Sequence, residues 1–125
     1  MRYDDSILHP PGPIVPVQVR PAGRLEPIQT KPGELDTGSD ITVIPDALVD
    51  NLRLRAEDSV LMIGYDDIAT ERTTYSVDLE IAEYKLESVR VVAAPRNTIL
   101  LGRDILNRFI ITLDGKALTF EMKDP

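Results

Sequence analysis

Strict alternation of apolar and polar residues is the feature that most limits how this chain can fold. Within residues 73–81, every second side chain is Thr, Tyr, Val, Leu or Ile. Residues 14–19 repeat the pattern, with three valines on one side of the run. A period of two is typical of a β-strand that buries one face. We therefore expect an all-β fold, because chains of this length with such strands close as sandwiches or barrels.

The same alternation and the positions of proline divide the rest of the chain into short elements. Residues 59–84 predict a long β-hairpin with a polar tip at residues 65–70. Pro45 favours a short helix immediately after it, and residues 103–109 favour a second helix of one or two turns. Further strands are expected at residues 25–30, 41–44, 85–94 and 97–102.

Three stretches are expected to interrupt or flank the strands. Residues 31–33 have the sequence Lys-Pro-Gly, which favours a turn. Asp114-Gly115 divides residues 110–122 into two strands and favours a type I′ hairpin. Residues 1–13 are rich in proline and predict an extended arm that is either disordered or lies on a neighbouring subunit. A single domain is then expected over residues 14–125.

The composition excludes several classes of function. The net charge of −7 and the pI of about 4.6 oppose binding to nucleic acids or anionic membranes, which both require clustered cations. The absence of cysteine rules out disulfides, thiol nucleophiles and cysteine-rich zinc sites. The single histidine, His9, lies in the proline-rich N-terminal stretch, from which a Ser-His-Asp arrangement would have to recruit it. No apolar run reaches the roughly 18 residues of a membrane span, so we expect a cytoplasmic protein without cofactors.

The polar cluster Glu-Leu-Asp-Thr-Gly-Ser-Asp at residues 34–40 is the clearest candidate for chemistry. On its own, this cluster is as compatible with a surface turn as with a catalytic carboxylate at Asp36. Two carboxylates a few ångströms apart share one proton, so one acts as a base and the other as an acid when water attacks a peptide bond. Gly38 would allow a close approach of the backbone, and Ser39 would donate a hydrogen bond to the Asp36 carboxylate.

Three segments, in order along the chain, carry a family resemblance. Residues 35–45, LDTGSDITVIP, resemble the active-site strand and loop of retropepsin-like aspartic proteases, the single-domain class that includes the retroviral enzymes. Residues 62–75, MIGYDDIATERTTY, resemble the flap hairpin of that family. Residues 98–106, TILLGRDIL, resemble the segment that precedes its C-terminal helix. The resemblance covers roughly residues 14–113. It implies the acid-protease fold, a closed β-barrel with one lobe per chain.

The resemblance also implies a site and a partner. Asp36 would be the catalytic residue, with Thr37, Gly38 and Ser39 in the active-site loop and the Thr37 hydroxyl tying the loop to its symmetry mate. Because the chain contains no second Asp-Thr-Gly, each active site would need Asp36 from two copies of the chain in a homodimer. The implied activity is that of an aspartic endopeptidase acting on peptide or protein substrates.

A flap and an apolar cleft are expected to contact the substrate. The tip sequence Tyr-Asp-Asp-Ile-Ala departs from the glycine-rich tips of retroviral flaps, which predicts either a stiffer flap or one that disfavours acidic substrates. Tyr65 would either pack within the hairpin or form a hydrogen bond toward the active site. Ile41 and Val43 are expected to add apolar lining, so apolar substrate side chains are expected beside the cleaved bond. The expected flap and cleft residues are Ile63, Gly64, Tyr65, Asp66, Asp67, Ile68 and Leu100.

One ion pair and two departures complete the resemblance. Arg103 is expected to pair with Asp40, as the equivalent residues do in the family, in a partly buried structural ion pair. Pro32-Gly33 stands where the family has a continuous apolar strand, which puts the strand entering the motif in doubt. The hairpin at residues 110–122 replaces the terminal strand through which retroviral protomers interleave, so the dimer interface is expected to differ.

Three alternatives remain open from the sequence. The fold could serve as a dimerisation or peptide-binding module without turnover, which the altered flap and the break before the motif both motivate. Phosphoryl transfer on Asp36 lacks the further residues that phospho-accepting aspartates carry beside them. A metal centre built on Asp36, Asp40, Asp66 and Asp67 lacks a usable histidine, so no metal is expected.

Overall fold

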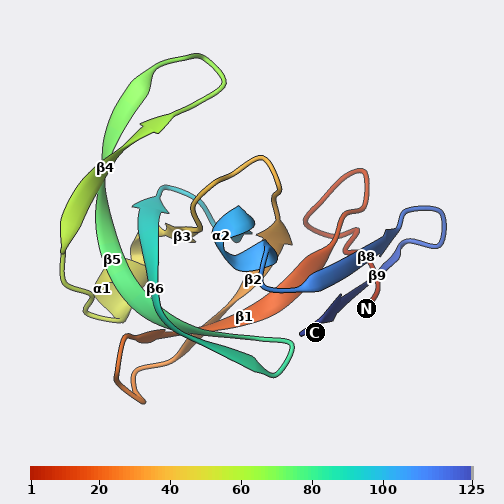
Figure 1. Ribbon diagram of the computed structural model, residues 1–125, viewed down its shortest axis with the longest axis horizontal. Coiled ribbons are helices and arrows are strands. Elements are labelled where there is room, and N and C mark those ends of the chain that lie inside the picture. The colour runs from red at the N-terminus through yellow and green to blue at the C-terminus, as the bar shows by residue number, and fades with distance from the viewer. Residues whose placement is uncertain (125) are drawn as a thin grey trace.

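A computed structural model describes residues 1–124 of the chain (Figure 1). The strands are β1 (Ile14–Pro21), β2 (Gln29–Leu35), β3 (Val43–Pro45), β4 (Asp58–Ile63), β5 (Ala69–Ile81), β6 (Tyr84–Ala94), β7 (Ile99–Leu101), β8 (Ile110–Asp114) and β9 (Thr119–Lys123). The two helices are α1 (Asp46–Asn51) and α2 (Arg103–Leu106). The expected all-β class with two short helices is confirmed. Within these described residues, no helix is long and apolar enough to cross a membrane.

Six strands close a barrel in the order β1, β2, β7, β3, β6 and β5, and β5 pairs back onto β1. Most of the pairs are antiparallel, but β2 runs parallel to β7 and β3 runs parallel to β6. In the described part of the chain, β4 pairs only with β5, and the two form an arm that stands away from the barrel (Figure 1). Among residues 1–124, each of the six barrel strands has a paired neighbour on both sides, so the barrel itself has no open edge.

The interior of the barrel is filled with aliphatic side chains, as the alternating pattern predicts. Buried residues alternate with half-buried or exposed ones along β1 and over residues 77–81 of β5, whereas Thr74 is buried in place of the predicted Thr73 and Tyr75. Leu48 and Leu52 attach α1 to this core, and both are fully buried. Phe120 of β9 is the largest fully buried side chain in the described residues and joins the small β8–β9 ribbon to the same cluster.

Pro32 and Gly33 lie inside β2, so the predicted turn at residues 31–33 is wrong. The register places Pro32 opposite Pro16 of β1. Because neither proline has an N–H, the two must form a pair that exchanges no hydrogen bonds between its members. The pairings of the two strands with their other neighbours begin one residue later, at Val17 and Gly33, so no ladder hydrogen bond is lost there.

Gly33 allows β1 and β2 to approach closely over the core. A Cβ at this position would lie 2.6 Å from Cγ2 of Val17 and 3.3 Å from Cδ1 of Leu101. The strand expected at residues 25–30 is mostly a loop, because pairing of β2 with β1 begins only at Gln29. Strand register and close packing therefore accommodate Pro32-Gly33, and the strand that leads to Asp36 is continuous.

Residues 1–13 fold back onto their own chain and do not form the expected extended arm. The Tyr3 amide donates a hydrogen bond of 2.8 Å to a carbonyl just before β9, and the Tyr3 ring packs against Phe120 with ring centroids 6.1 Å apart. Paired backbone hydrogen bonds of 2.7 and 3.0 Å between Asp4 and Gly12 close a loop. The Ile7 amide donates a hydrogen bond to the Asp4 carboxylate, and this bond lowers the pKa of the Asp4 carboxyl group.

The β8–β9 hairpin is present as expected, but its predicted type I′ turn is wrong. Four residues, 115–118, join the two strands. The Asp114 side chain accepts a hydrogen bond of 2.9 Å from the Ala117 amide, which stabilises this longer loop. Leu118, and not Gly115, takes the left-handed backbone conformation, with φ of 57°.

Replacing Gly33 by alanine is expected to lower the free energy of unfolding by about 1–3 kcal/mol, because the added methyl group overlaps Val17 in a filled core. Chemical denaturation followed by circular dichroism measures the change. Gly115→Ala is the matched control, since an added methyl group meets nothing within 4 Å there, and it should change the value by less than about 0.5 kcal/mol. Equal losses in the two variants would contradict the close approach at Gly33.

Candidate active site

Asp36 directly follows β2, at the point where this strand leaves its parallel partner β7. The Asp36 backbone amide donates a hydrogen bond of 3.0 Å to the Leu101 carbonyl. Oδ1 of its side chain accepts a hydrogen bond of 2.9 Å from the Gly38 amide. The side chain is partly buried. The backbone and the carboxylate of Asp36 are therefore both held by main-chain groups, which fixes where the carboxylate lies.

The junction between β7 and α2 passes directly beneath the loop that follows Asp36. Gly102 is buried there, and a Cβ at this position would lie 2.8 Å from both the carbonyl carbon and the carbonyl oxygen of Ile41. The next amide, of Arg103, donates a hydrogen bond of 2.8 Å to the Ser39 carbonyl. Only a glycine allows this approach, so the predicted Leu-Gly-Arg segment supports the acidic loop from below.

Ser39 stabilises the loop but does not contact the Asp36 carboxylate, contrary to the expectation. Its hydroxyl donates a hydrogen bond of 2.7 Å to the Ile41 carbonyl, and its amide donates one of 3.2 Å to the Asp36 carbonyl. Thr37 and Gly38 are exposed at the outer end of the loop. The Thr37 side chain is therefore accessible to a second molecule.

The expected ion pair between Asp40 and Arg103 is not formed in the described chain. Asp40 is exposed and has no ion-pair partner among residues 1–124. The Arg103 guanidinium donates instead to the Thr37 carbonyl, over 2.6 Å. Arg103 still holds the acidic loop, but it does so through the carbonyls of the loop and not through its second carboxylate.

Asp104 forms a network that sequence analysis missed. Its carboxylate accepts hydrogen bonds from the Thr42 amide at 3.1 Å and the Thr42 hydroxyl at 2.8 Å. Thr42 is fully buried, and its hydroxyl oxygen accepts a hydrogen bond of 3.1 Å from the Gly102 amide. Asp104 thus ties α2 to the strand that leaves the loop. The sequence contains one indication of this network, which is an acidic residue in the first turn of the predicted helix. Such a carboxylate can accept hydrogen bonds from nearby amides.

Glu34 and Arg96 form a second unexpected contact, which supports the end of β2. Their side chains are 2.8 Å apart and only about one quarter exposed. The Thr98 hydroxyl donates to the same carboxylate, and Nε of Arg96 donates to the Thr98 carbonyl over 2.8 Å. Glu34 stands two residues before Asp36, so this cluster fixes the strand that carries the candidate catalytic residue. No local pattern predicts a contact across 62 residues of sequence.

The hairpin of β4 and β5 forms the predicted flap and stands open above the barrel (Figure 1). At its tip, the Asp67 amide donates to the Gly64 carbonyl at 3.0 Å, and Oδ1 of Asp66 accepts from the Ile68 amide at 3.2 Å. Asp67 itself takes a left-handed conformation, with φ of 60°, which aspartate tolerates better than most residues. Tyr65 is fully exposed, so it neither packs in the hairpin nor reaches the active-site loop.

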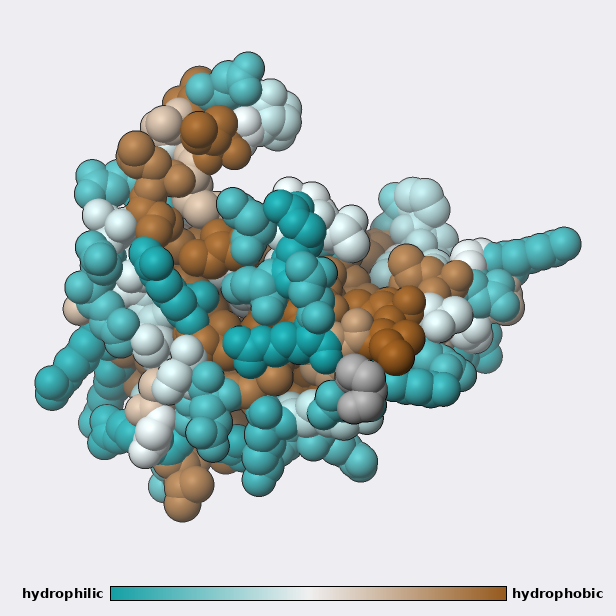
Figure 2. Space-filling model, viewed as in Figure 1, coloured by the Kyte–Doolittle hydropathy of each residue, from teal (hydrophilic) through white to brown (hydrophobic). Residues whose placement is uncertain are grey.

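A cavity of about 340 Å³ lies between the flap and the barrel, where Figure 2 shows a hollow beneath the arm. Arg72 and Arg96 also line it, so the expectation of an apolar cleft is only partly met. Ile41 and Ile63 line a neighbouring cavity of about 390 Å³. Asp36 lines neither cavity within a single chain. The expected residues that do surround the first cavity are Val43, Gly64, Tyr65, Asp66, Ile68 and Leu100.

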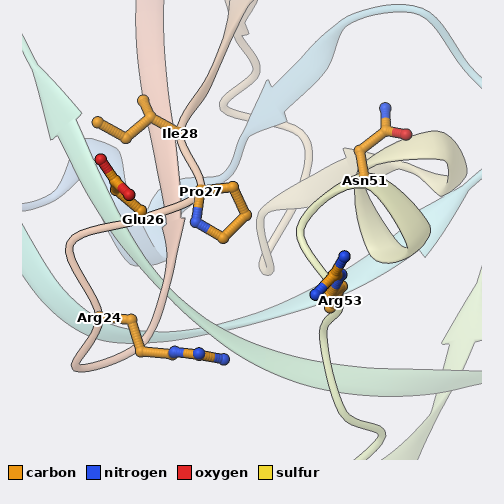
Figure 3. Close-up of a pocket in the computed structure, with 6 residues that line it drawn as sticks. All are labelled: Arg24, Glu26, Pro27, Ile28, Asn51 and Arg53. Atoms are coloured by element: carbon orange, nitrogen blue, oxygen red, sulfur yellow. The ribbon is translucent and has the colours of Figure 1, made fainter.

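Other places in the described part of the chain do not offer a site of the predicted kind. A larger cavity, of about 550 Å³, lies between the loop after β1 and the end of α1 (Figure 3). It contains none of the predicted site residues, so volume alone does not identify the active site. Within residues 1–124, no three His, Cys, Asp or Glu side chains gather as a metal site requires. The lining residues of the larger cavity are Arg24, Glu26, Pro27, Ile28, Asn51 and Arg53.

Comparison with known sequences places these features in one family model. A model described as Aspartyl protease matches residues 17–105. The matched range contains the acidic loop, the flap and the Leu-Gly-Arg segment. No curated protein sequence is significantly similar to the chain.

Solved structures of retroviral-type proteases share the fold of this chain. The EIAV protease, solved with the inhibitor HBY-793, is 22% identical, with 77% of this chain and 86% of that chain covered and a TM-score of 0.62. The simian foamy virus (mac) protease is 21% identical, with coverages of 74% and 91% and a TM-score of 0.53. A retropepsin-like aspartic protease from Rickettsia conorii is 14% identical, with coverages of 87% and 92% and a TM-score of 0.52. The predicted retropepsin-like closed barrel is confirmed.

Replacing Asp104 by alanine is expected to lower the free energy of unfolding by about 1–3 kcal/mol, because the buried Thr42 amide and hydroxyl lose their acceptor. Asp40→Ala is the matched control, since it removes an exposed carboxylate near the same loop, and it should change the value by less than about 0.5 kcal/mol. Urea denaturation at one fixed protein concentration measures both. A large loss of unfolding free energy for Asp40→Ala alone would contradict this result and support the ion pair that the sequence predicted.

Proposed function

The chain belongs to the aspartyl protease family, and we propose that it is an aspartic endopeptidase that acts as a homodimer. The placement of Asp36 carries the proposal. Its carboxylate is held at the end of a parallel strand pair, on a barrel that also carries a flap over an open cavity. The chain supplies one Asp-Thr-Gly, and Thr37 and Gly38 beside it are exposed. A second copy can therefore bring its own Asp36 to the same place.

Two Asp36 carboxylates side by side would share one proton, since both cannot ionise at a few ångströms. The ionised carboxylate takes a proton from a water molecule while the water oxygen attacks the peptide carbonyl carbon. The protonated carboxyl group donates its proton to the carbonyl oxygen, which gives a neutral tetrahedral intermediate. Collapse of this intermediate breaks the C–N bond, and a proton passes to the leaving amine. Closure of the flap over the substrate excludes bulk water during these steps.

The β8 edge is the surface on which we place the second copy. The outer edge of β9 is taken by the N-terminal segment, in which Arg2 bridges to Thr119. Within residues 1–124, β8 pairs only with β9, and it exposes Ile110 and Leu113 at 55% each. An open strand edge with exposed apolar side chains favours the addition of another strand. A twofold axis brings the same edge of two copies together, so the proposed interface is β8 against β8.

A peptide-binding module without turnover is the second candidate function. The altered flap tip favours it, because Tyr65 at this tip is fully exposed. The two candidates share the fold and the cleft, and they differ only in whether a bound peptide is cleaved.

The variant Asp36→Asn is expected to reduce peptide cleavage by about 100- to 10 000-fold, because it removes the group that exchanges the proton. A synthetic peptide library incubated with each protein and read by mass spectrometry measures cleavage, and sedimentation shows whether the variant keeps its dimer. Equal cleavage by wild type and variant would contradict the assignment. Binding of library peptides by the wild type without any cleavage would establish the second candidate.

Leu113→Lys is expected to shift the protein from dimer to monomer and to lower the specific activity in parallel, because it places a cation at the proposed β8 interface. Sedimentation velocity at several concentrations measures the association. Leu25→Lys is the matched control, since Leu25 is 84% exposed in the loop after β1, and it should leave the dimer intact. An unchanged dimer in Leu113→Lys would show that the interface lies elsewhere.

A further inference from the structure

We propose that the cavity under the flap is a subsite for an acidic substrate side chain, with Arg72 and Arg96 as its specificity-determining residues. The inference rests on the proposed peptidase function and names the substrate class of that same site. Arg72 reaches the cavity from β5 of the flap, and Arg96 reaches it from the segment between β6 and β7. A side chain that enters the cavity of about 340 Å³ therefore meets an arginine from each of two separate elements.

Arg96 is held in place by contacts that use only part of its hydrogen-bonding capacity. Nε donates to the Thr98 carbonyl at 2.8 Å. Nη2 donates to Oε2 of Glu34 at 2.8 Å and to the Thr98 hydroxyl oxygen at 2.9 Å. Nη1 has no hydrogen-bond partner among the described residues. A guanidinium fixed on one side and open on the other binds a carboxylate with little further loss of side-chain freedom.

Arg72 has no partner of its own in the described part of the chain. It makes no ion pair or side-chain hydrogen bond there, although it is partly buried and lies in the strand of the flap opposite Val60. A partly buried cation without a counter-ion is stabilised when a ligand supplies a negative charge, and charge-assisted hydrogen bonds are stronger than neutral ones. The substrate is the natural source of that charge, because the cavity lies between the flap and the barrel.

The acidic groups around the cavity do not satisfy these two arginines. Glu34 pairs with Nη2 of Arg96 and leaves its Nη1 open, whereas the charge of Arg72 has no counter-ion among the described residues. The flap aspartates predict a bias against acidic substrates, but Oδ1 of Asp66 is used by the Ile68 amide at 3.2 Å, and Asp67 does not line the cavity. A basic substrate side chain would meet the unmatched charge of Arg72 and only a donor on Arg96, which opposes its entry.

The rest of the cavity wall favours glutamate over the shorter aspartate. The apolar residues Val43, Val92 and Leu100 line the same cavity and can pack against the methylene groups of a longer side chain. The carboxylate at its end then lies where the guanidinium groups are. The overall charge of −7 gives acidic peptides no general attraction to this protein, so a preference for them has to come from a local site.

The first test compares peptides that differ in one side chain. A peptide cleaved by the wild type is resynthesised with Glu, Gln or Lys at each position within about three residues of the cleaved bond. At one position, kcat/KM is expected to be about tenfold higher for Glu than for Gln, and lower again for Lys. Arg72→Met should bring the Glu-to-Gln ratio close to one, and Arg72→Glu should reverse the order of Glu and Lys. Arg90→Met removes an exposed arginine from the middle of β6 and should leave every ratio unchanged.

The second test separates this inference from the peptidase function. Immobilised Asp36→Asn protein is incubated with the synthetic peptide library, and the retained peptides are sequenced. Enrichment of Glu that disappears when Arg72→Glu is added supports the subsite even if the wild type cleaves nothing. Cleavage by the wild type with equal kcat/KM for Glu and Gln at every position would overturn the subsite and leave the peptidase function intact. Equal thermal stability of Arg72→Met and wild type shows that the variant keeps its fold. If the variant is less stable, the Glu-to-Gln ratio of the wild type alone tests the subsite.

Discussion

The backbone hydrogen bond from the Asp36 amide to the Leu101 carbonyl extends the parallel pairing of β2 and β7 one step past the end of β2. The residues that hold the acidic loop directly follow Leu101 in the chain, so this bond places them beside the loop. Gly102 follows Leu101 and lets the chain pass under the acidic loop at a distance that no Cβ allows. The first turn of α2 then supplies the Arg103 and Asp104 contacts that hold the loop from the other side. The carboxylate is fixed because two segments far apart in sequence leave the barrel together.

The single fixed carboxylate of the chain is the reason for the proposed homodimer, because the proposed hydrolysis uses two carboxylates. The loop presents Thr37 and Gly38 outward, and β8 leaves one strand edge open in the described residues. The N-terminal segment covers the neighbouring strand of the same chain, so it does not have to cross to a second copy. The open flap and the two arginines beneath it fit the same proposal. A bound acidic substrate would fill the cavity under the flap and supply a counter-ion for Arg72.

Much of this fold is readable from the sequence, because alternation and glycine positions are local signals. The long hairpin follows from alternation and the first helix from Pro45, whereas the flap and the role of Asp36 came from the family resemblance. Pro32 and Gly33 misled the prediction, because a proline inside a strand is tolerated only through its register with Pro16, and register is a property of two strands. Arg103 was the expected partner of a carboxylate, yet it contacts a carbonyl of the loop. The contacts of Asp104 with Thr42 and of Glu34 with Arg96 each span 62 residues, so no pattern within one segment could reveal them.

The central claim is that each active site contains Asp36 from two chains, and a mixing experiment tests it most directly. Wild type and Asp36→Asn protein are combined in varying proportions at constant total concentration, allowed to exchange subunits, and assayed on one cleaved peptide. Mixed dimers carry one carboxylate and should be inactive, so activity should fall with the square of the wild-type fraction. A fall in direct proportion to that fraction would show that a single chain forms the active site, and it would contradict the account.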